Sequence, residues 1–109
     1  MTRGEDYRQV VRNGTRVGGA YCITYAVRRS GDDTTDPARF GYIISKAVGN
    51  AVVRNRTRRR MKFVTDELLR AGVSDVDIVF RALPASANAG FAELQQEMLR
   101  SVAKVLDRL

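Results

Sequence analysis

The chain has 109 residues, of which 19 are Lys or Arg and 12 are Asp or Glu, and it contains no histidine. This length suits one domain over residues 1–109, and a hydrophobic fraction of 44% is enough for a packed core. No apolar run approaches the ~20 residues of a membrane span, and the first residues do not read as a secretion signal. A single cysteine, Cys22, excludes an internal disulfide. We therefore expect a small, basic, cytoplasmic protein without membrane association.

Two elements are predicted before residue 30. Residues 5–13 predict a short helix that ends at Gly14, because acidic residues in the first turn complement the helix dipole and glycine commonly follows the last turn. Residues 20–28 alternate between two faces and predict a strand. One face of this strand carries the larger side chains, namely Tyr21, Ile23, Tyr25 and Val27.

The middle of the chain predicts a hairpin followed by a long helix. Residues 30–38 are polar and rich in turn formers, so we expect the strand before them to pair with the next strand, residues 40–45. Gly49 and Asn50 then begin a helix that runs to residue 71. At about 100° per residue, the buried stripe of this helix consists of Val53, Thr57, Met61, Val64 and Leu68.

The last third of the chain predicts a strand over residues 76–82 and a closing helix over residues 90–109. This helix has an apolar stripe that we expect to face the core: Phe91, Leu94, Met98, Val102, Val105 and Leu109. The order of elements is therefore helix, strand, strand, helix, strand, helix. Such an order predicts an α+β fold in which helices pack against one small, mainly antiparallel sheet.

The net charge of +7 comes from one part of the chain. Residues 46–62 hold seven basic residues and no acidic one, and the rest of the chain is left with 12 of each. A basic patch on a neutral body is typical of a protein that binds a polyanion. The alternative is a solvated helix face, but such faces commonly mix the two signs of charge. Arg54, Arg58 and Lys62 form a line along one border of the buried stripe.

The sequence offers little for catalysis by the protein itself. Without histidine and with one cysteine, it lacks the commonest general base and a thiolate metal site. The acidic residues fall at a helix start, in the polar loop, on a helix face and beside a strand, and none lies at ligand-like spacing. We expect Cys22 to be a small buried residue. We therefore expect no catalytic residue, and no metal or cofactor bound by this chain alone.

Three tyrosines raise the question of base stacking. Tyr21 and Tyr25 share one face of the predicted strand, and Tyr7 on the first helix could join them. Single-stranded nucleic acid is often held on such aromatic platforms beside a basic groove. The same side chains could instead pack between sheet and helix, and the pattern alone leaves both possibilities open for Tyr21 and Tyr25.

The run over residues 40–64, FGYIISKAVGNAVVRNRTRRRMKFV, resembles the signature of the bacterial ribonuclease P protein family. That family carries a strand ending in Ser-Lys, a Gly-Asn-Ala-Val element and an Arg-Asn-Arg helix. Here these elements occur in the same order and spacing, at residues 45–46, 49–52 and 54–56. The resemblance extends over nearly the whole chain, because further stretches are similar to the family's first helix, later strand and closing helix: residues 6–11, 77–79 and 91–94.

The resemblance implies a fold similar to the ribosomal protein S5 domain 2-like sandwich, with a left-handed βαβ crossover. It implies a protein subunit of ribonuclease P, an endoribonuclease in which RNA is the catalyst and the protein assists removal of the 5′ leader from precursor tRNA. The implied partners are the catalytic RNA and precursor tRNA. Mg²⁺ is expected in the RNA–protein holoenzyme, and no protein partner is predicted.

The resemblance also implies roles for individual residues. It assigns an RNA-facing set: Ser45, Lys46, Asn50, Arg54, Asn55, Arg56 and Arg59. The basic line along the helix adds Arg58 and Lys62 to this set. The leader is implied to lie in a cleft formed by Tyr7, Val11 and Tyr25. The chain departs from the family where an aromatic residue, a lysine and an apolar residue are common, at Val11, Ala47 and Arg60 respectively.

Two other classes of protein remain compatible with the charge pattern. A ribosomal-type structural RNA-binding protein would bind folded RNA without a leader cleft. In that case, alanine at Tyr7 and Tyr25 would change stability and leave RNA affinity unchanged. A DNA-binding domain is less favoured, because no helix-turn-helix spacing occurs in the sequence.

Overall fold

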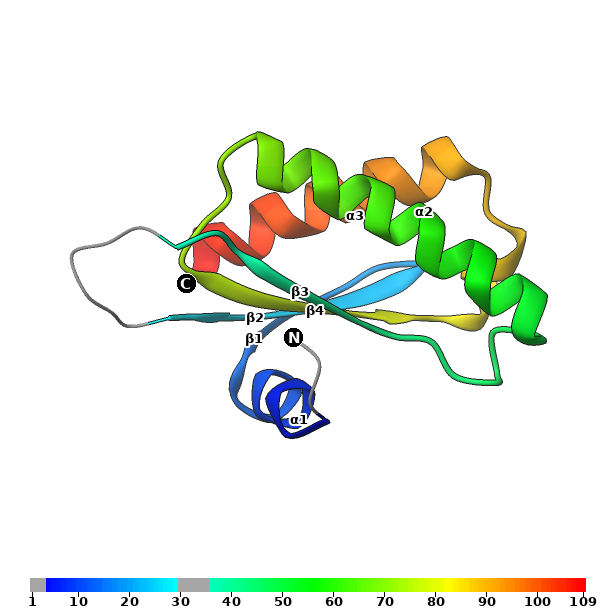
Figure 1. Ribbon diagram of the computed structural model, residues 1–109, viewed down its shortest axis with the longest axis horizontal. Helices are drawn as coiled ribbons and strands as arrows, with labels where there is room; N and C mark the ends of the chain where they lie inside the picture. The colour runs from blue at the N-terminus through cyan, green and yellow to red at the C-terminus, as the bar shows by residue number, and fades with distance from the viewer. Residues whose placement is uncertain (1–3, 30–35) are drawn as a thin grey trace.

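The computed structural model describes residues 4–29 and 36–109, which form a four-stranded sheet with helices on both faces (Figure 1). In chain order the elements are α1 (Gly4–Asn13), β1 (Thr15–Gly18), β2 (Cys22–Arg28), β3 (Arg39–Ile43), α2 (Ala51–Arg70), β4 (Val76–Ala82), the 3₁₀ helix η1 (Pro84–Asn88) and α3 (Phe91–Arg108). Helices α2 and α3 cover one face of the sheet, and α1 packs on the other (Figure 1). The predicted α+β fold is confirmed. None of the helices in the described ranges has the length and hydrophobicity needed to cross a membrane.

The strand order is β1-β2-β4-β3, which places β4 in the interior of the sheet. β4 runs antiparallel to β2 and parallel to β3. The predicted hairpin between β2 and β3 is therefore wrong. Parallel neighbours need a crossover connection, and α2 supplies it between β3 and β4. Most of the polar loop that suggested the hairpin lies outside the described residues, and the left-handed crossover stays a prediction.

The sequence pattern missed the edge strand β1 and the short helix η1. Among the described residues β1 pairs only with β2, and one of its four residues, Val17, is buried. A strand of that length with one inward apolar side chain has too little alternation to be recognised. The other elements begin and end within two residues of the predicted positions.

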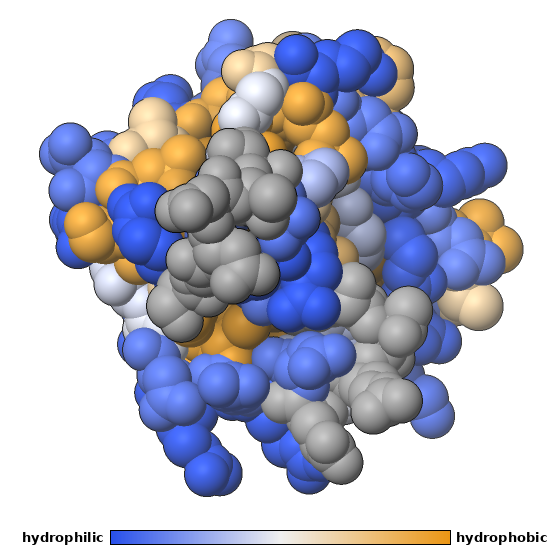
Figure 2. All heavy atoms as spheres, turned by 60° about the vertical axis from the view of Figure 1, so that its left-hand side comes forward, coloured by the Kyte–Doolittle hydropathy of each residue, from blue (hydrophilic) through white to orange (hydrophobic). Residues whose placement is uncertain are grey.

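The alternation of β2 divides its side chains between two hydrophobic clusters. Cys22 and Ala26 face α2 and α3 in the larger cluster, whereas Tyr25 joins Val10 and Val79 in the smaller cluster under α1. The buried stripe predicted for α2 is observed, with Val53 at its partly buried end. The face of the molecule shown in Figure 2 has hydrophilic residues along most of its border and areas of hydrophobic residues among them.

Tyr21 does not share a face with Tyr25, so that prediction is wrong. The strand begins only at Cys22, and Tyr21 lies in the preceding bend, packed against the larger cluster. Its hydroxyl donates to a carboxylate oxygen of Glu93 on α3 at 2.7 Å. This hydrogen bond raises the pKa of Tyr21 and lowers the pKa of Glu93. Tyr21 is therefore remote from any platform formed under α1.

A buried carboxylate joins α3 to the turn between β1 and β2. Glu97 is 6% exposed and accepts the backbone N–H groups of Ala20, Tyr21 and Cys22 at 2.7, 2.8 and 2.9 Å. The turn approaches so closely that a Cβ on Gly19 would lie 2.6 Å from Glu97 Cδ. Burial, and to a smaller extent Glu97, raises the pKa of the Cys22 thiol to about 12. Cys22 is thus the buried core residue that the sequence predicted.

Candidate nucleic-acid interface

The basic segment occupies the loop before α2 and the first three turns of that helix. Asn50 caps the helix, because its Oδ1 accepts the backbone N–H of Val53 at 3.0 Å. None of the first-turn residues of α2, all of which are described, is acidic. The positive end of the helix dipole is therefore not offset by the helix's own first-turn side chains. Ser45 and Lys46, just before the cap, are both exposed.

The outer side of α2 carries cationic and amide side chains. We group them with Lys46, from the loop before the helix, and call the set the α2 basic face: Lys46, Arg54, Asn55, Arg58, Arg59 and Lys62. Asn55, Arg58 and Arg59 are exposed, and Arg58 Nη1 lies 3.5 Å from Asn55 Oδ1. Arg54 is half-buried at the border of the stripe, and its Nε has no hydrogen-bond partner among the described residues. Lys62 pairs with Asp66 at 3.1 Å, but exposed ion pairs of this kind are weak. Most of the predicted RNA-facing set thus lies together.

Two arginines of the same helix face a different way. Arg56 Nη2 donates to the carbonyl oxygen of Ala87, and Arg60 Nη1 donates to that of Ala89, each at 3.0 Å. Both arginines are half-buried and tie α2 to the η1 connection. Arg56, predicted to face RNA, therefore has a structural partner that the sequence did not reveal. A guanidinium has five N–H donors, so one hydrogen bond leaves others for a ligand.

An apolar groove lies between α1 and the ends of β3 and β4. Its volume is about 240 Å³, and we call it the α1 groove, lined by Tyr7, Arg8, Val11, Arg12, Ile43 and Arg81. A second depression, of about 370 Å³, shares Ile43 and Arg81 with it and reaches Ser45 and Pro84. The two depressions together lead from α1 to the loop that precedes α2.

The Tyr7 ring forms one wall of the α1 groove because it lies directly on a glycine. Gly41 is buried in β3, and a Cβ built on it would overlap the Tyr7 ring. The strand therefore leaves space for the ring only because residue 41 has no side chain. Val11, one turn further along α1, is also partly buried beside the small cluster.

Tyr25, the third predicted cleft residue, lies beneath the groove. It is 6% exposed and belongs to the small cluster under α1. The guanidinium carbon of Arg81 is 6.0 Å from the centre of its ring, within the range of a cation–π contact. The structure thus places Tyr25 in the core, where it supports Arg81, and places Tyr7 and Val11 at the surface of the groove.

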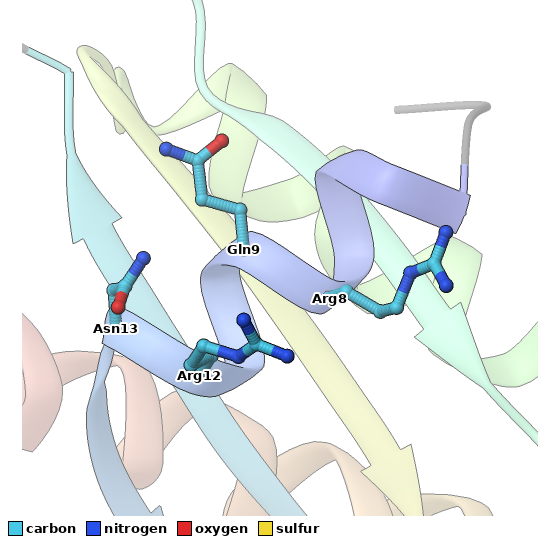
Figure 3. Close-up of a pocket in the computed structure, with 4 residues that line it drawn as sticks. All are labelled: Arg8, Gln9, Arg12 and Asn13. Carbon is cyan, nitrogen blue, oxygen red and sulfur yellow. The ribbon is translucent and has the colours of Figure 1, made fainter.

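Sequence reasoning missed the three arginines at the edge of the groove. Arg8 and Arg12 lie one turn apart on α1, and both also line a depression of about 450 Å³ with Gln9 and Asn13. Figure 3 shows these four side chains projecting from α1 in front of the sheet. Their i,i+4 spacing was a signal that could have located this rim. Arg81 gave no such signal, because its position depends on β4 lying beside β3.

The described residues do not fit a metal site held by this protein. They contain no group of three or more Asp, Glu, Cys or His side chains placed to hold an ion. The buried carboxylates have other partners: Glu97 binds the β1–β2 turn, and Asp77 pairs with Arg39 at 2.6 Å and Arg29 at 3.7 Å. We therefore assign no ligand in this chain to the Mg²⁺ expected in a holoenzyme.

An α+β sandwich with an arginine-rimmed apolar groove that leads to a basic helix defines a nucleic-acid-binding protein. The chain matches the family model described as Ribonuclease P over residues 1–106. It is 42% identical over 106 residues to the ribonuclease P protein component of Clavibacter michiganensis subsp. michiganensis, across 97% of this chain and 91% of that relative. It is 40% identical to the corresponding protein of Acidothermus cellulolyticus, across 96% and 86%. The chain belongs to the ribonuclease P protein family.

Solved structures of similar fold come from the same family. The RNase P protein of Staphylococcus aureus superposes with a TM-score of 0.77 at 21% identity, across 98% of this chain and 91% of that one. The RNase P protein of Thermotoga maritima, in complex with 1-(4-fluorophenyl)-2-thiourea, superposes with a TM-score of 0.80 at 15% identity, across 92% and 94%. These similarities concern the fold.

Proposed function

We propose that this chain, as the protein subunit of ribonuclease P, binds the catalytic RNA through the α2 basic face and the 5′ leader of precursor tRNA through the α1 groove. The observation that carries the proposal is the path of the groove. It runs from Tyr7 on α1, past Ile43 and Arg81, to Ser45 beside the basic helix. One protein can therefore contact a leader and a second RNA at adjacent sites.

The α2 basic face suits a folded RNA. Arginine forks donate bidentately to phosphate, and the positive end of the α2 dipole adds to their field. Arg58 and Arg59 are exposed to solvent. They can therefore bind phosphates without breaking a hydrogen bond to a buried group of the protein. Each phosphate that is neutralised releases counterions, so this face supplies affinity that depends on salt and little on sequence.

The α1 groove suits a single strand. Its apolar lining, from Tyr7, Val11 and Ile43, can contact the face of a base that is not stacked in a helix. Arg8, Arg12 and Arg81 at its edges can hold the phosphates of the same strand. A duplex conceals its base faces, so the groove favours an unpaired leader over the body of tRNA.

In this proposal the chain contributes binding and charge neutralisation, and cleavage is the work of the RNA. Contact with the leader raises the affinity of the complex for precursor tRNA over mature tRNA. The cations of the α2 basic face lower the repulsion between two polyanions. Such a role places the protein in the cytoplasm and requires no catalytic side chain from it.

The proposal is tested by cleavage of precursor tRNA with a bacterial ribonuclease P RNA at low Mg²⁺. Adding the protein is expected to raise the cleavage rate at subsaturating substrate by roughly tenfold or more, because several phosphates are neutralised at once. Polylysine at equal total charge serves as the control for charge alone. A ribosomal-type RNA-binding protein would bind the RNA without stimulating cleavage, and that result would contradict the proposal.

Arg59→Ala is expected to weaken binding to the ribonuclease P RNA and to lower the slope of log K against log salt by about one unit, since one phosphate contact is lost. Arg100→Ala is the matched control, because Arg100 is an exposed arginine on α3, outside the α2 basic face. Filter binding or fluorescence titration at several salt concentrations gives both slopes. If the two variants have equal slopes of log K against log salt, the RNA does not bind at the α2 basic face.

A further inference from the structure

An exposed hydrophobic side chain in the first turn of α2 lies beside part of the α2 basic face. Val52 is 75% exposed, the highest value among the large hydrophobic side chains that the structure describes. Together with Asn55, Arg58 and Arg59 it lines a shallow depression of about 440 Å³. Positions 52, 55 and 59 recur at spacings of three and four, so these side chains lie along one side of the helix.

Nothing within the described chain accounts for a valine at this position. The side of α2 that carries Val52 is opposite the buried stripe of Thr57, Met61 and Val64. A β-branched residue lowers helix propensity, and the first turn of a helix favours acidic or small polar residues. An isolated exposed valine is ordinary on a protein surface. This one, however, lines a depression whose other lining residues are two cations and an amide.

We propose that Val52 packs against an unstacked nucleobase of the RNA bound to the α2 basic face, while Arg58 and Arg59 hold the phosphates on either side of that base. This inference rests on the proposed function and names the feature of the RNA that the face selects. An RNA duplex presents phosphates and ribose hydroxyls to a protein, and its base faces are hidden in the stack. The face of a base in a bulge or loop is the apolar surface that an RNA can offer to the methyl groups of a valine.

The charges around Val52 favour RNA over a protein as the occupant. Two of its four lining residues are arginines, so an apolar protein knob would have to desolvate them without compensation. A nucleotide brings both parts, an aromatic base for Val52 and phosphates for the arginines. Asn55 adds an exposed amide that can hydrogen-bond to the edge of the base. The site therefore reads an unpaired nucleotide through shape and apolar contact.

The test separates apolar from electrostatic contributions. With a bacterial ribonuclease P RNA transcript as the probe, Val52→Ser is expected to weaken binding roughly fivefold, the order expected for losing part of the burial of one valine side chain. The slope of log K against log salt should stay at the wild-type value, unlike that of Arg59→Ala. Leu99→Ser, on the 37% exposed Leu99 of α3, is the matched control and should leave affinity unchanged.

A second measurement tests whether Val52 contacts an unpaired nucleotide. Two RNA hairpins, identical except for one unpaired nucleotide in the stem of the second, are titrated with each protein. The wild-type protein should prefer the bulged hairpin, and Val52→Ser should bind the two equally. Urea unfolding of the variant should match the wild type, because the side chain at residue 52 is exposed in the folded protein.

The outcomes distinguish this inference from the function on which it rests. If the wild-type protein does not bind the transcript, the proposed function and this inference both fail. If it binds and Val52→Ser binds equally well, the inference alone is overturned. A changed salt slope for Val52→Ser, or an equal loss for Leu99→Ser, would also overturn it, because the effect would then be electrostatic or unspecific.

Discussion

Replacing Glu97 by alanine is expected to lower the free energy of unfolding by about 3–5 kcal/mol. The carboxylate accepts three backbone N–H groups, from Ala20, Tyr21 and Cys22, and the N–H of Cys22 is buried. Hydrogen bonds to a charged group are the stronger ones, and a buried donor left without an acceptor carries an additional cost. Domains of this size are commonly stable by about 5–15 kcal/mol, so the variant should be close to unfolding. The urea midpoint measures the loss.

The control for Glu97 is the acidic residue one turn earlier on α3. Glu93 accepts from the Tyr21 hydroxyl and from the N–H of Gly90, but both bonds are exposed, so Glu93→Ala should lower the urea midpoint much less than Glu97→Ala. Thiol labelling at pH 8 gives a second reading, because Cys22 is fully buried with a pKa of about 12 and should react only when the chain opens. A Glu97→Ala protein with a wild-type midpoint and labelling rate would show that the β1–β2 turn is held by other contacts.

Gly41→Ala is expected to remove most of the preference for precursor over mature tRNA in the RNA–protein complex. The new Cβ would overlap the Tyr7 ring, so the ring must leave the strand and the α1 groove loses a wall. One stacked base is worth about 1–3 kcal/mol, so the ratio of the two affinities should fall roughly fivefold or more. Affinity for the catalytic RNA alone should hold, because the α2 basic face is untouched. Equilibrium binding of the two tRNAs to the reconstituted complex measures the ratio.

Three comparisons make the Gly41 experiment specific. Gly18→Ala is the matched control, because no heavy atom lies within 4 Å of a Cβ at that position. Tyr7→Ala removes the ring without any overlap and should lower the same ratio. Overpacking at Gly41 can also cost about 1–3 kcal/mol of stability, so circular dichroism must first establish that the variant is folded at the assay temperature. If the ratio of the affinities for precursor and mature tRNA is unchanged in both Gly41→Ala and Tyr7→Ala, the leader does not bind in the α1 groove.

Local periodicity predicted the elements other than β1 and η1, but not how the strands are ordered. The stripe of α2, from Thr57 to Leu68, and the alternation of β2 are set by residues close in sequence, and both are observed. The partners of β3 are set by tertiary packing. A polar loop after β2 indicates that the chain turns, but it does not indicate which strand β3 will pair with. In the structure β3 lies on the other side of β4 from β2. The hairpin prediction failed for that reason.

The candidate site was predictable where its residues are neighbours in sequence. Arg54, Arg58 and Arg59 stand on one helix, so their charge and spacing were enough to place them together. Arg56 was harder, because its partner at Ala87 is 31 residues away and belongs to a helix that the pattern did not reveal. The depth of Tyr25 below the groove likewise depends on how α1 packs across the sheet, which no local pattern encodes.

The position of β4 also bears on how the protein is made. This strand lies between β2 and β3, yet it is contributed by residues 76–82, after about two thirds of the chain has been synthesised. Until then β2 and β3 have no common neighbour, and the groove lacks Val79 beneath it and Arg81 at its edge. A nascent chain therefore exposes the arginines of α2 before it has a sheet to arrange them. The arginines of α2 are synthesised before the strand that completes the sheet and the α1 groove. A chain interrupted between the two would therefore bind RNA through its charge, without the groove that distinguishes one RNA from another.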